Sequence, residues 1–214
     1  MIASRTSSSN RKNDGFTIIE LMIALSVLST ILVISSAVVI NLGVLFTRGV
    51  NQSNTQNTTR NVINEITNQL RLGGATPILP AGSNVFCLGS QRYAYVLDHK
   101  LDGASTSDHV LWRDTMKNSA SCQSLGITGV PNPTDSLTNT TISGTELMGA
   151  NMRLTDFNIF DNGNGTYTVK VTVAYGDDDL VYKIGSRTLC RAGSGSQFCA
   201  VSELVQTVSK REGM

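Results

Sequence analysis

The chain lacks most of the patterns that mark enzymes and nucleic-acid-binding proteins. Only 15% of its residues are charged and the formal net charge is +1, so nothing in the charge balance requires a nucleic-acid partner. The sequence contains no phosphate-binding loop, no HExxH motif and no nucleophile elbow. The four cysteines include no CxxC pair, which argues against a zinc site. We therefore expect neither catalysis nor a cofactor.

Proline and histidine are also scarce. The chain has four prolines, the first at Pro77, and two histidines. The histidines follow aspartates, in Asp98-His99 and Asp108-His109, beside expected turns, and we predict that both lie on the surface rather than in a catalytic site. Glycine, asparagine, serine and threonine are common in the second half, which favours β structure with many turns.

The four cysteines all lie beyond a long apolar run and are predicted to form disulfides in an oxidising compartment. They are Cys87, Cys122, Cys190 and Cys199. Three pairings are possible. The local one, Cys87 with Cys122 and Cys190 with Cys199, closes the shortest loops and is favoured.

The apolar run is long enough to cross a bilayer. The 20 residues from Leu21 to Ile40 carry no charge, and at about 1.5 Å per residue they span roughly 30 Å. Residues 1–15 contain three bases and one acid, which predicts a cytoplasmic N-terminus and an exported remainder. A cleaved signal peptide ending near Ser35-Ser36-Ala37, or an ordinary single-pass anchor, would also explain the length.

Glu20 separates these alternatives. A charged side chain near the bilayer centre costs about 2.5–3.5 kcal/mol, so such residues usually have a partner. If the chain were cut between Gly15 and Phe16, the new α-amino group would lie one helical turn from Glu20. That cation could pair with Glu20 within one chain or between neighbouring helices.

The segment KNDGFTIIEL, Lys12 to Leu21, resembles the cleavage and methylation signature of type IV prepilins and pseudopilins. The resemblance implies that a prepilin peptidase cuts after Gly15 and methylates Phe16. It also implies that Glu20 pairs with the Phe16 amine of an adjacent subunit. The protein would then be a structural filament subunit whose partners are other pilin subunits (in a homo- or hetero-filament), the inner-membrane assembly platform and membrane lipid. It would begin as a precursor in the cytoplasmic membrane and end in an extracellular or periplasmic filament.

The same resemblance implies an α+β fold, the pilin-like α/β roll, in which a long N-terminal helix packs on an antiparallel sheet. The expected parts are a leader (1–15), a transmembrane and filament-core helix (16–46), the soluble half of that helix (47–74) and a head (75–214) with a disulfide near its end. Many major pilins carry a proline in the apolar stretch, where this chain has Ala37. Its absence favours a minor pilin or pseudopilin, and retention of Glu20 argues against the tip-most pseudopilins.

Periodicity predicts the elements in more detail. A helix is expected from Phe16 to Leu72, followed by Gly73-Gly74, with Val62, Ile66 and Leu70 packed on a sheet and Val50 and Ile63 in the same spacing. Strands are expected at Val85–Leu88, Tyr93–Leu97, His109–Trp112, Met152–Phe160, Thr166–Tyr175 and, with helix as the alternative, Val201–Val208. Residues 161–165 are expected to form a hairpin turn rather than a calcium loop. Ser119–Gly149 is interpreted as a surface loop.

Two further functions are considered. Asp177, Asp178 and Asp179 are predicted to form a solvated turn and are weak candidates for a calcium site. The whole chain has 17 basic and 16 acidic residues, and removal of residues 1–15 takes away three bases and one acid, which leaves 14 bases and 15 acids. The remaining chain has no basic stripe that would favour DNA uptake. An adhesin or DNA-uptake (competence) pilin that uses the Ser119–Gly149 loop, or a plain single-pass membrane protein, are the alternatives to a structural filament subunit.

Overall fold

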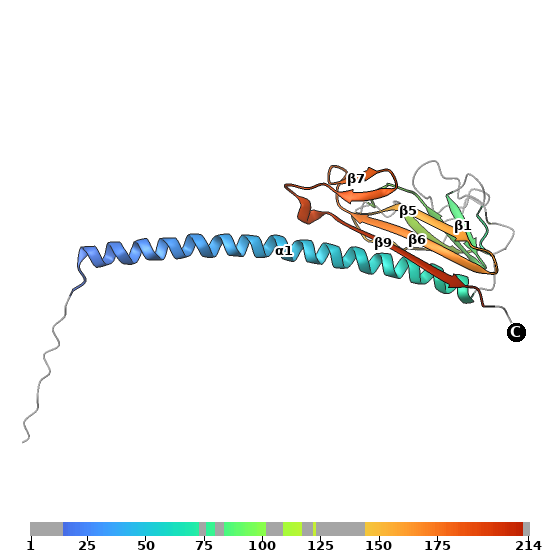
Figure 1. The fold of residues 1–214 in the computed structure, drawn as a ribbon, viewed down its shortest axis with the longest axis horizontal. Helices are drawn as coiled ribbons and strands as arrows, with labels where there is room; N and C mark the ends of the chain where they lie inside the picture. The colour runs from blue at the N-terminus through green and yellow to red at the C-terminus, as the bar shows by residue number, and fades with distance from the viewer. Residues whose placement is uncertain are drawn as a thin grey trace, which may run out of the picture. The chain divides into compact units, whose positions relative to one another are not determined.

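The computed structural model describes residues 15–72, 76–79, 84–101, 109–116, 122 and 144–211. The chain divides into two compact units, residues 1–43 and residues 44–214. A single 55-residue helix, α1 (Ile18–Leu72), passes from the first unit into the second (Figure 1). The predicted helix is confirmed apart from its first two residues, and no proline interrupts it.

The second unit contains a four-stranded antiparallel sheet in the order β1-β2-β3-β4. Its strands are β1 (Val85–Leu88), β2 (Gln91–Tyr95), β3 (Leu111–Thr115) and β4 (Gly144–Glu146). The first is as predicted. β2 begins and ends two residues earlier than expected, and β3 begins two residues and ends three residues later than expected. Most of the predicted loop Ser119–Gly149 lies outside the described residues. The loop prediction was wrong at residues 144–146, which form β4. Three residues show no alternation, so the pairing of β4 with Trp112–Asp114 is what reveals the strand.

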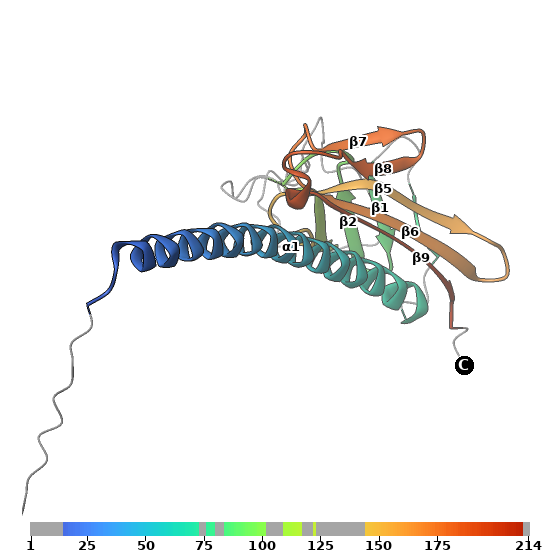
Figure 2. The ribbon, with the colours of Figure 1, turned by 60° about the vertical axis from the view of Figure 1, so that its left-hand side comes forward.

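A three-stranded antiparallel sheet is formed by β5 (Met152–Asp161), β6 (Thr166–Tyr175) and β9 (Ala200–Ser209). The predictions for all three strands are confirmed. From Thr166 to Val171 of β6, Tyr167, Val169 and Val171 are buried and Thr166, Thr168 and Lys170 are less buried, which is the expected period of two; from Val171 to Ala174 every residue is buried. β9 runs alongside the later part of α1 in both Figure 1 and Figure 2, and Gln52 Nε2 of that helix donates to the Val201 carbonyl at 3.4 Å.

A short hairpin of β7 (Val181–Ile184) and β8 (Arg187–Cys190) was not predicted. Thr188 Oγ donates to Thr155 Oγ at 2.9 Å, and Lys183 Nζ donates to the Thr155 carbonyl at 2.8 Å. The hairpin is therefore fastened to β5. A 3₁₀ turn, η2 (Ser196–Phe198), follows it and leads into β9.

The core of the second unit lies between α1 and the two larger sheets. Val62, Ile66 and Leu70 are at most 1% exposed and pack against residues of β1, β2, β5 and β6, which confirms the predicted apolar stripe. Phe86 stacks on Tyr93 with ring centroids 4.6 Å apart. Full burial of such side chains stabilises the fold by about 1.5–3 kcal/mol each.

Towards residue 44 the buried face of α1 is polar. Val50, which shares the predicted spacing, is 40% exposed, and Asn51, Thr55 and Thr59 are buried instead. The hydroxyls of Thr55 and Thr59 donate to carbonyls four residues back at 2.7 Å, and Asn51 Nδ2 donates to the Gln197 carbonyl at 2.9 Å. Because these polar groups are satisfied, their burial carries little penalty.

The cysteines form the local pairs, Cys87–Cys122 and Cys190–Cys199, with Cα atoms 6.0 and 5.7 Å apart. The first joins β1 to residue 122, beyond β3. The second joins the end of β8 to the residue that precedes β9. Each disulfide thus connects one strand of the second unit to a residue that follows that strand in the sequence.

Candidate processing and assembly site

The first turn of α1 is fixed by a reciprocal pair of hydrogen bonds between Thr17 and Glu20. The Thr17 backbone N–H and hydroxyl both donate to Glu20 Oε2 at 2.9 Å. The Glu20 N–H donates to the Thr17 hydroxyl oxygen at 3.3 Å. This is a capping box, T-x-x-E, which satisfies N–H groups that the helix itself leaves without acceptors. Thr17 is therefore the N-cap residue of α1, and Gly15 and Phe16 precede the helix.

The Gly15–Phe16 peptide bond lies in exposed, non-helical chain. Phe16 is 89% exposed, and a Cβ placed on Gly15 would meet no atom within 4 Å. The bond is thus unobstructed within the described residues. An extended segment of this kind is what a peptidase cleft can accept.

The helix that follows has an apolar surface without protein cover. Among the described residues, one helix is long and apolar enough to cross a membrane, and its most apolar stretch has no buried residue. Ile34, Ile40 and Phe46 are 65%, 68% and 74% exposed. A helix that is apolar all round requires lipid or other helices around it.

Most of the polar side chains in this stretch donate to carbonyls of the helix itself. Hydroxyls at four positions donate to carbonyls three residues back, each at 2.8 Å: Ser26, Ser29, Thr30 and Ser36. Asn41 Nδ2 donates to the Ala37 carbonyl at 3.0 Å. Because a bilayer supplies no water, such internal pairing suits a membrane-embedded helix.

Comparison with known proteins finds a match, and it lies at the N-terminal end of the chain. Residues 10–36 match the family model for the prokaryotic N-terminal methylation motif. The chain carries the type IV prepilin signature. No curated protein and no solved structure matches it. The described fold, a long N-terminal helix and antiparallel sheets, is α+β and consistent with a pilin. The signature points to a membrane-anchored, pilin- or pseudopilin-type precursor, a structural subunit rather than an enzyme, which in general implies prepilin peptidase and other pilin subunits as partners.

The weak calcium candidates of this prepilin-type chain lie in a turn between β6 and β7. Asp177 Oδ1 accepts a hydrogen bond from Lys100 Nζ at 2.7 Å, and Asp178 Oδ1 lies 2.6 Å from Arg153 Nη1. The hydrogen bond from Lys100 lowers the pKa of Asp177 below its ordinary value. Within the described ranges no three His, Cys, Asp or Glu side chains are grouped so that they could hold a metal ion. Two of the three carboxylates are thus already paired with cations.

In the hairpin turn at residues 161–165, the Asp161 carboxylate is hydrogen-bonded within the turn. Asp161 Oδ1 accepts from the Gly163 N–H at 2.8 Å, and Gly163, Asn164 and Gly165 all have positive φ. A positive φ favours glycine and asparagine, which explains the sequence of this turn.

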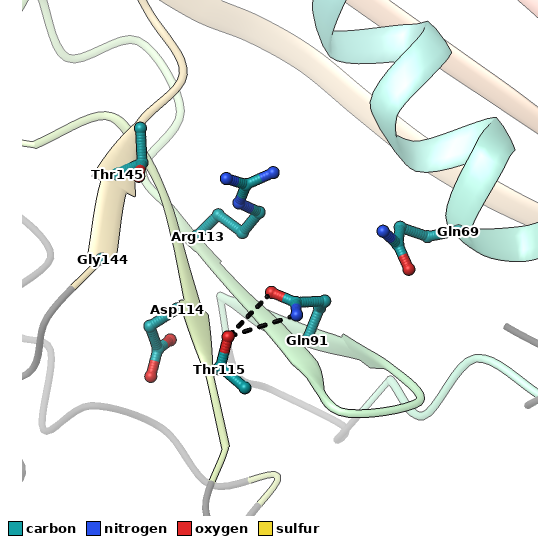
Figure 3. Close-up of a pocket in the computed structure, with 7 residues that line it drawn as sticks. All are labelled: Gln69, Gln91, Arg113, Asp114, Thr115, Gly144 and Thr145. Atoms are coloured by element: carbon teal, nitrogen blue, oxygen red, sulfur yellow. Dashed lines mark hydrogen bonds between the residues drawn. The ribbon is translucent and has the colours of Figure 1, made fainter.

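The structure also contains a polar cavity that the sequence did not predict (Figure 3). It has a volume of about 290 Å³ and lies between the end of α1 and the four-stranded sheet. Its lining residues are Gln69, Gln91, Arg113, Asp114, Thr115, Gly144 and Thr145. Arg113 is paired with Glu65 at 2.6 Å, and Gln91 is hydrogen-bonded to Thr115 at 3.2 Å. Arg113, Gln91 and Thr115 therefore already have polar partners.

The prediction for the histidines was wrong in one case. His109 is buried beside Trp112, because the residues around β3 pack against Glu146 of β4. His99 is partly exposed, and Asp108 lies outside the described residues.

Proposed function

We propose that this chain is a minor pilin or pseudopilin, a structural subunit of a type IV pilus-like filament. It is made as a membrane precursor, cut between Gly15 and Phe16, methylated at Phe16 and lifted into a filament by an assembly platform in the inner membrane. Residues 16–46 would form the filament core, residues 47–74 the soluble half of the helix and residues 75–214 the head.

One observation carries this proposal: the match at residues 10–36 continues directly into an uncovered apolar helix. A secreted protein with a cleavable signal would lose that helix, and a plain anchor would not need the Gly15-Phe16 junction. The helix also lacks the proline of many major pilins, which supports a minor pilin or pseudopilin.

Glu20 has a defined place in this scheme. Both Thr17 hydrogen bonds end on Glu20 Oε2, so we assign Oε1 to the charged amine that cleavage would create on Phe16 of a neighbouring subunit. An unpaired carboxylate among apolar helices is costly, so wrong staggers of the subunits would be disfavoured.

Processing is tested by intact mass and N-terminal sequencing of the protein from its native membrane. We expect a chain that begins at methylated Phe16, with four hydrogens missing from the cysteines. The variant Gly15→Val should retain the leader, because a branched side chain obstructs the site, whereas the control Gly43→Ala should be processed normally. A native chain that begins at Met1 would refute the proposal.

Assembly is tested separately with Glu20→Gln, which keeps the shape of the side chain but removes its charge. We expect this variant to remain in the membrane fraction. Its amount in sheared filaments should fall at least tenfold, which is equivalent to about 1.4 kcal/mol for the lost ion pair. Glu203→Gln on β9 serves as a matched control and should enter filaments normally. Equal incorporation of both variants would remove the assigned role of Glu20.

A further inference from the structure

His109 is a buried histidine that has no hydrogen-bond partner among the described residues. Its side chain is 8% exposed, and neither ring nitrogen has a hydrogen-bond partner in the described structure. The imidazole ring lies against Trp112, with ring centroids 4.1 Å apart and the planes tilted by 52°. Buried polar atoms are usually paired, so an unpaired buried imidazole requires an explanation.

The nearest charged group to the imidazole is Glu146, at the end of β4. Glu146 Oε2 accepts from the Val110 N–H at 2.9 Å and lies 3.4 Å from His109 Nδ1. Glu146 Oε1 accepts from the N–H groups of Leu111 and Met148 at 3.0 and 2.9 Å. The carboxylate is therefore held in place by three backbone N–H groups, beside a histidine that can acquire a charge.

The other charged groups on these strands are already neutralised. On the Trp112 side of the sheet, Arg92 of β2 and Asp114 of β3 form a bidentate pair at 2.6 and 3.0 Å. Arg113 of β3 is paired with Glu65 of α1. Within the described ranges, Glu146 is thus the charge that a protonated His109 would meet.

We infer that His109 and Glu146 form a pH-sensitive clasp between the start of β3 and the end of β4. His109 Nδ1 lies 3.4 Å from Glu146 Oε2 and makes no hydrogen bond to it. Protonation makes both ring nitrogens donors and places a full positive charge beside a fixed carboxylate. Acid then closes the clasp and strengthens the attachment of β4, a strand of three residues, to β3.

Trp112 provides an internal probe, because it is the single tryptophan of the chain. The experiment follows its fluorescence in the full-length oxidised chain in detergent micelles, from about pH 8 to about pH 5, where histidines acquire their proton. Protonated imidazole accepts an electron from excited indole, so we expect a one-proton fall in emission. The fall should vanish in His109→Gln and persist in His99→Gln.

Amide hydrogen exchange of the wild-type chain tests the clasp without a mutation. After correction for the intrinsic pH dependence of exchange, the N–H groups of Val110, Leu111 and Met148 should be about fivefold better protected at the acid end of the range. Backbone N–H groups of β6 serve as the control and should show no such gain. Unchanged protection at the three sites, or a fluorescence transition that survives in His109→Gln, would overturn the inference.

Discussion

At the scale of single residues, the ion pair of Arg92 and Asp114 is the most deeply buried in the described structure. Its side chains are 7% and 1% exposed, and the two hydrogen bonds are bidentate. A buried ion pair can add little net stability to the fold. Removal of one partner is nevertheless strongly destabilising, because the remaining buried charge retains the full cost of its desolvation.

We predict that Asp114→Ala destabilises the head by about 3–5 kcal/mol, because it leaves the Arg92 guanidinium buried without its partner. Lys100→Ala, which breaks the exposed pair with Asp177, should change stability by no more than about 0.5 kcal/mol. Urea unfolding in detergent, followed by Trp112 fluorescence, measures both variants. Equal effects would mean that Arg92 finds another partner or water.

Two glycines should respond in opposite ways to a methyl group. A Cβ on Gly144 would lie 2.5 Å from the Arg113 carbonyl oxygen and from the Trp112 indole, so Gly144→Ala should destabilise the head by about 1–3 kcal/mol. A Cβ on Gly49 would meet nothing within 4 Å, and Gly49→Ala should stabilise α1 by up to about 1 kcal/mol. The same unfolding assay applies, and stabilisation by Gly144→Ala would contradict the packing described for Trp112.

At the scale of elements, Tyr93 of β2 makes the contact of the sheet with α1 sensitive to alkali. Burial, together with the negative charge of Glu65, raises the pKa of Tyr93 well above its ordinary value, with Arg113 acting in the opposite direction. The Tyr93 hydroxyl donates to Glu65 Oε1 at 3.3 Å. Above about pH 10 the unfolded chain therefore loses this proton before the folded chain does.

It follows that the stabilising contribution of protonated Tyr93 is complete below about pH 10 and decreases as the pH rises further. Tyr93→Phe should lessen this alkaline loss of stability, whereas Tyr182→Phe on β7 should leave it unchanged. Urea midpoints between about pH 9 and pH 12 provide the measurement. Tyr95, whose pKa is also raised by burial, should retain part of the slope. A slope that Tyr93→Phe leaves unaltered would disprove the assignment.

The elements that could be predicted are those with their own periodic pattern. β6 alternates threonine or lysine with tyrosine or valine from Thr166 to Val173, and Val62, Ile66 and Leu70 repeat at helical spacing. β4 and the hairpin of β7 and β8 are too short to alternate, and tertiary pairing defines them. The burial of Thr55 and Thr59 was not predicted for another reason. Their hydroxyls donate to carbonyls of the helix backbone, and a search for apolar residues at helical spacing does not detect buried polar residues of this kind.

The candidate site was predictable because its signals are local. Gly15, Phe16 and Glu20 lie within six residues, and the signature depends on their spacing alone. The capping bonds between Thr17 and Glu20 were not predicted, although T-x-x-E before an apolar run is the usual pattern of a capping box. The burial of His109 has no local signal, since it depends on Glu146, which lies 37 positions later in the sequence.

At the scale of the whole molecule, two disulfides stabilise a head that the filament model places outside the cell. Cys87–Cys122 spans 35 positions and Cys190–Cys199 spans 9. If each acts mainly by restricting the unfolded chain, the longer loop should contribute about 4 kcal/mol and the shorter about 2.5 kcal/mol. Removal of the first pair should therefore lower stability more than removal of the second.

We expect the paired variants Cys87→Ala/Cys122→Ala and Cys190→Ala/Cys199→Ala to show this order in urea midpoints. Both should be measured as full chains in detergent at one pH, with the fully reduced wild type as the lower limit. The second pair holds the β7–β8 hairpin next to β9, so its loss should increase amide exchange in β8 more than in β2. If removal of the second pair proved more damaging, native contacts of the hairpin, rather than chain entropy, would determine the contribution of that disulfide.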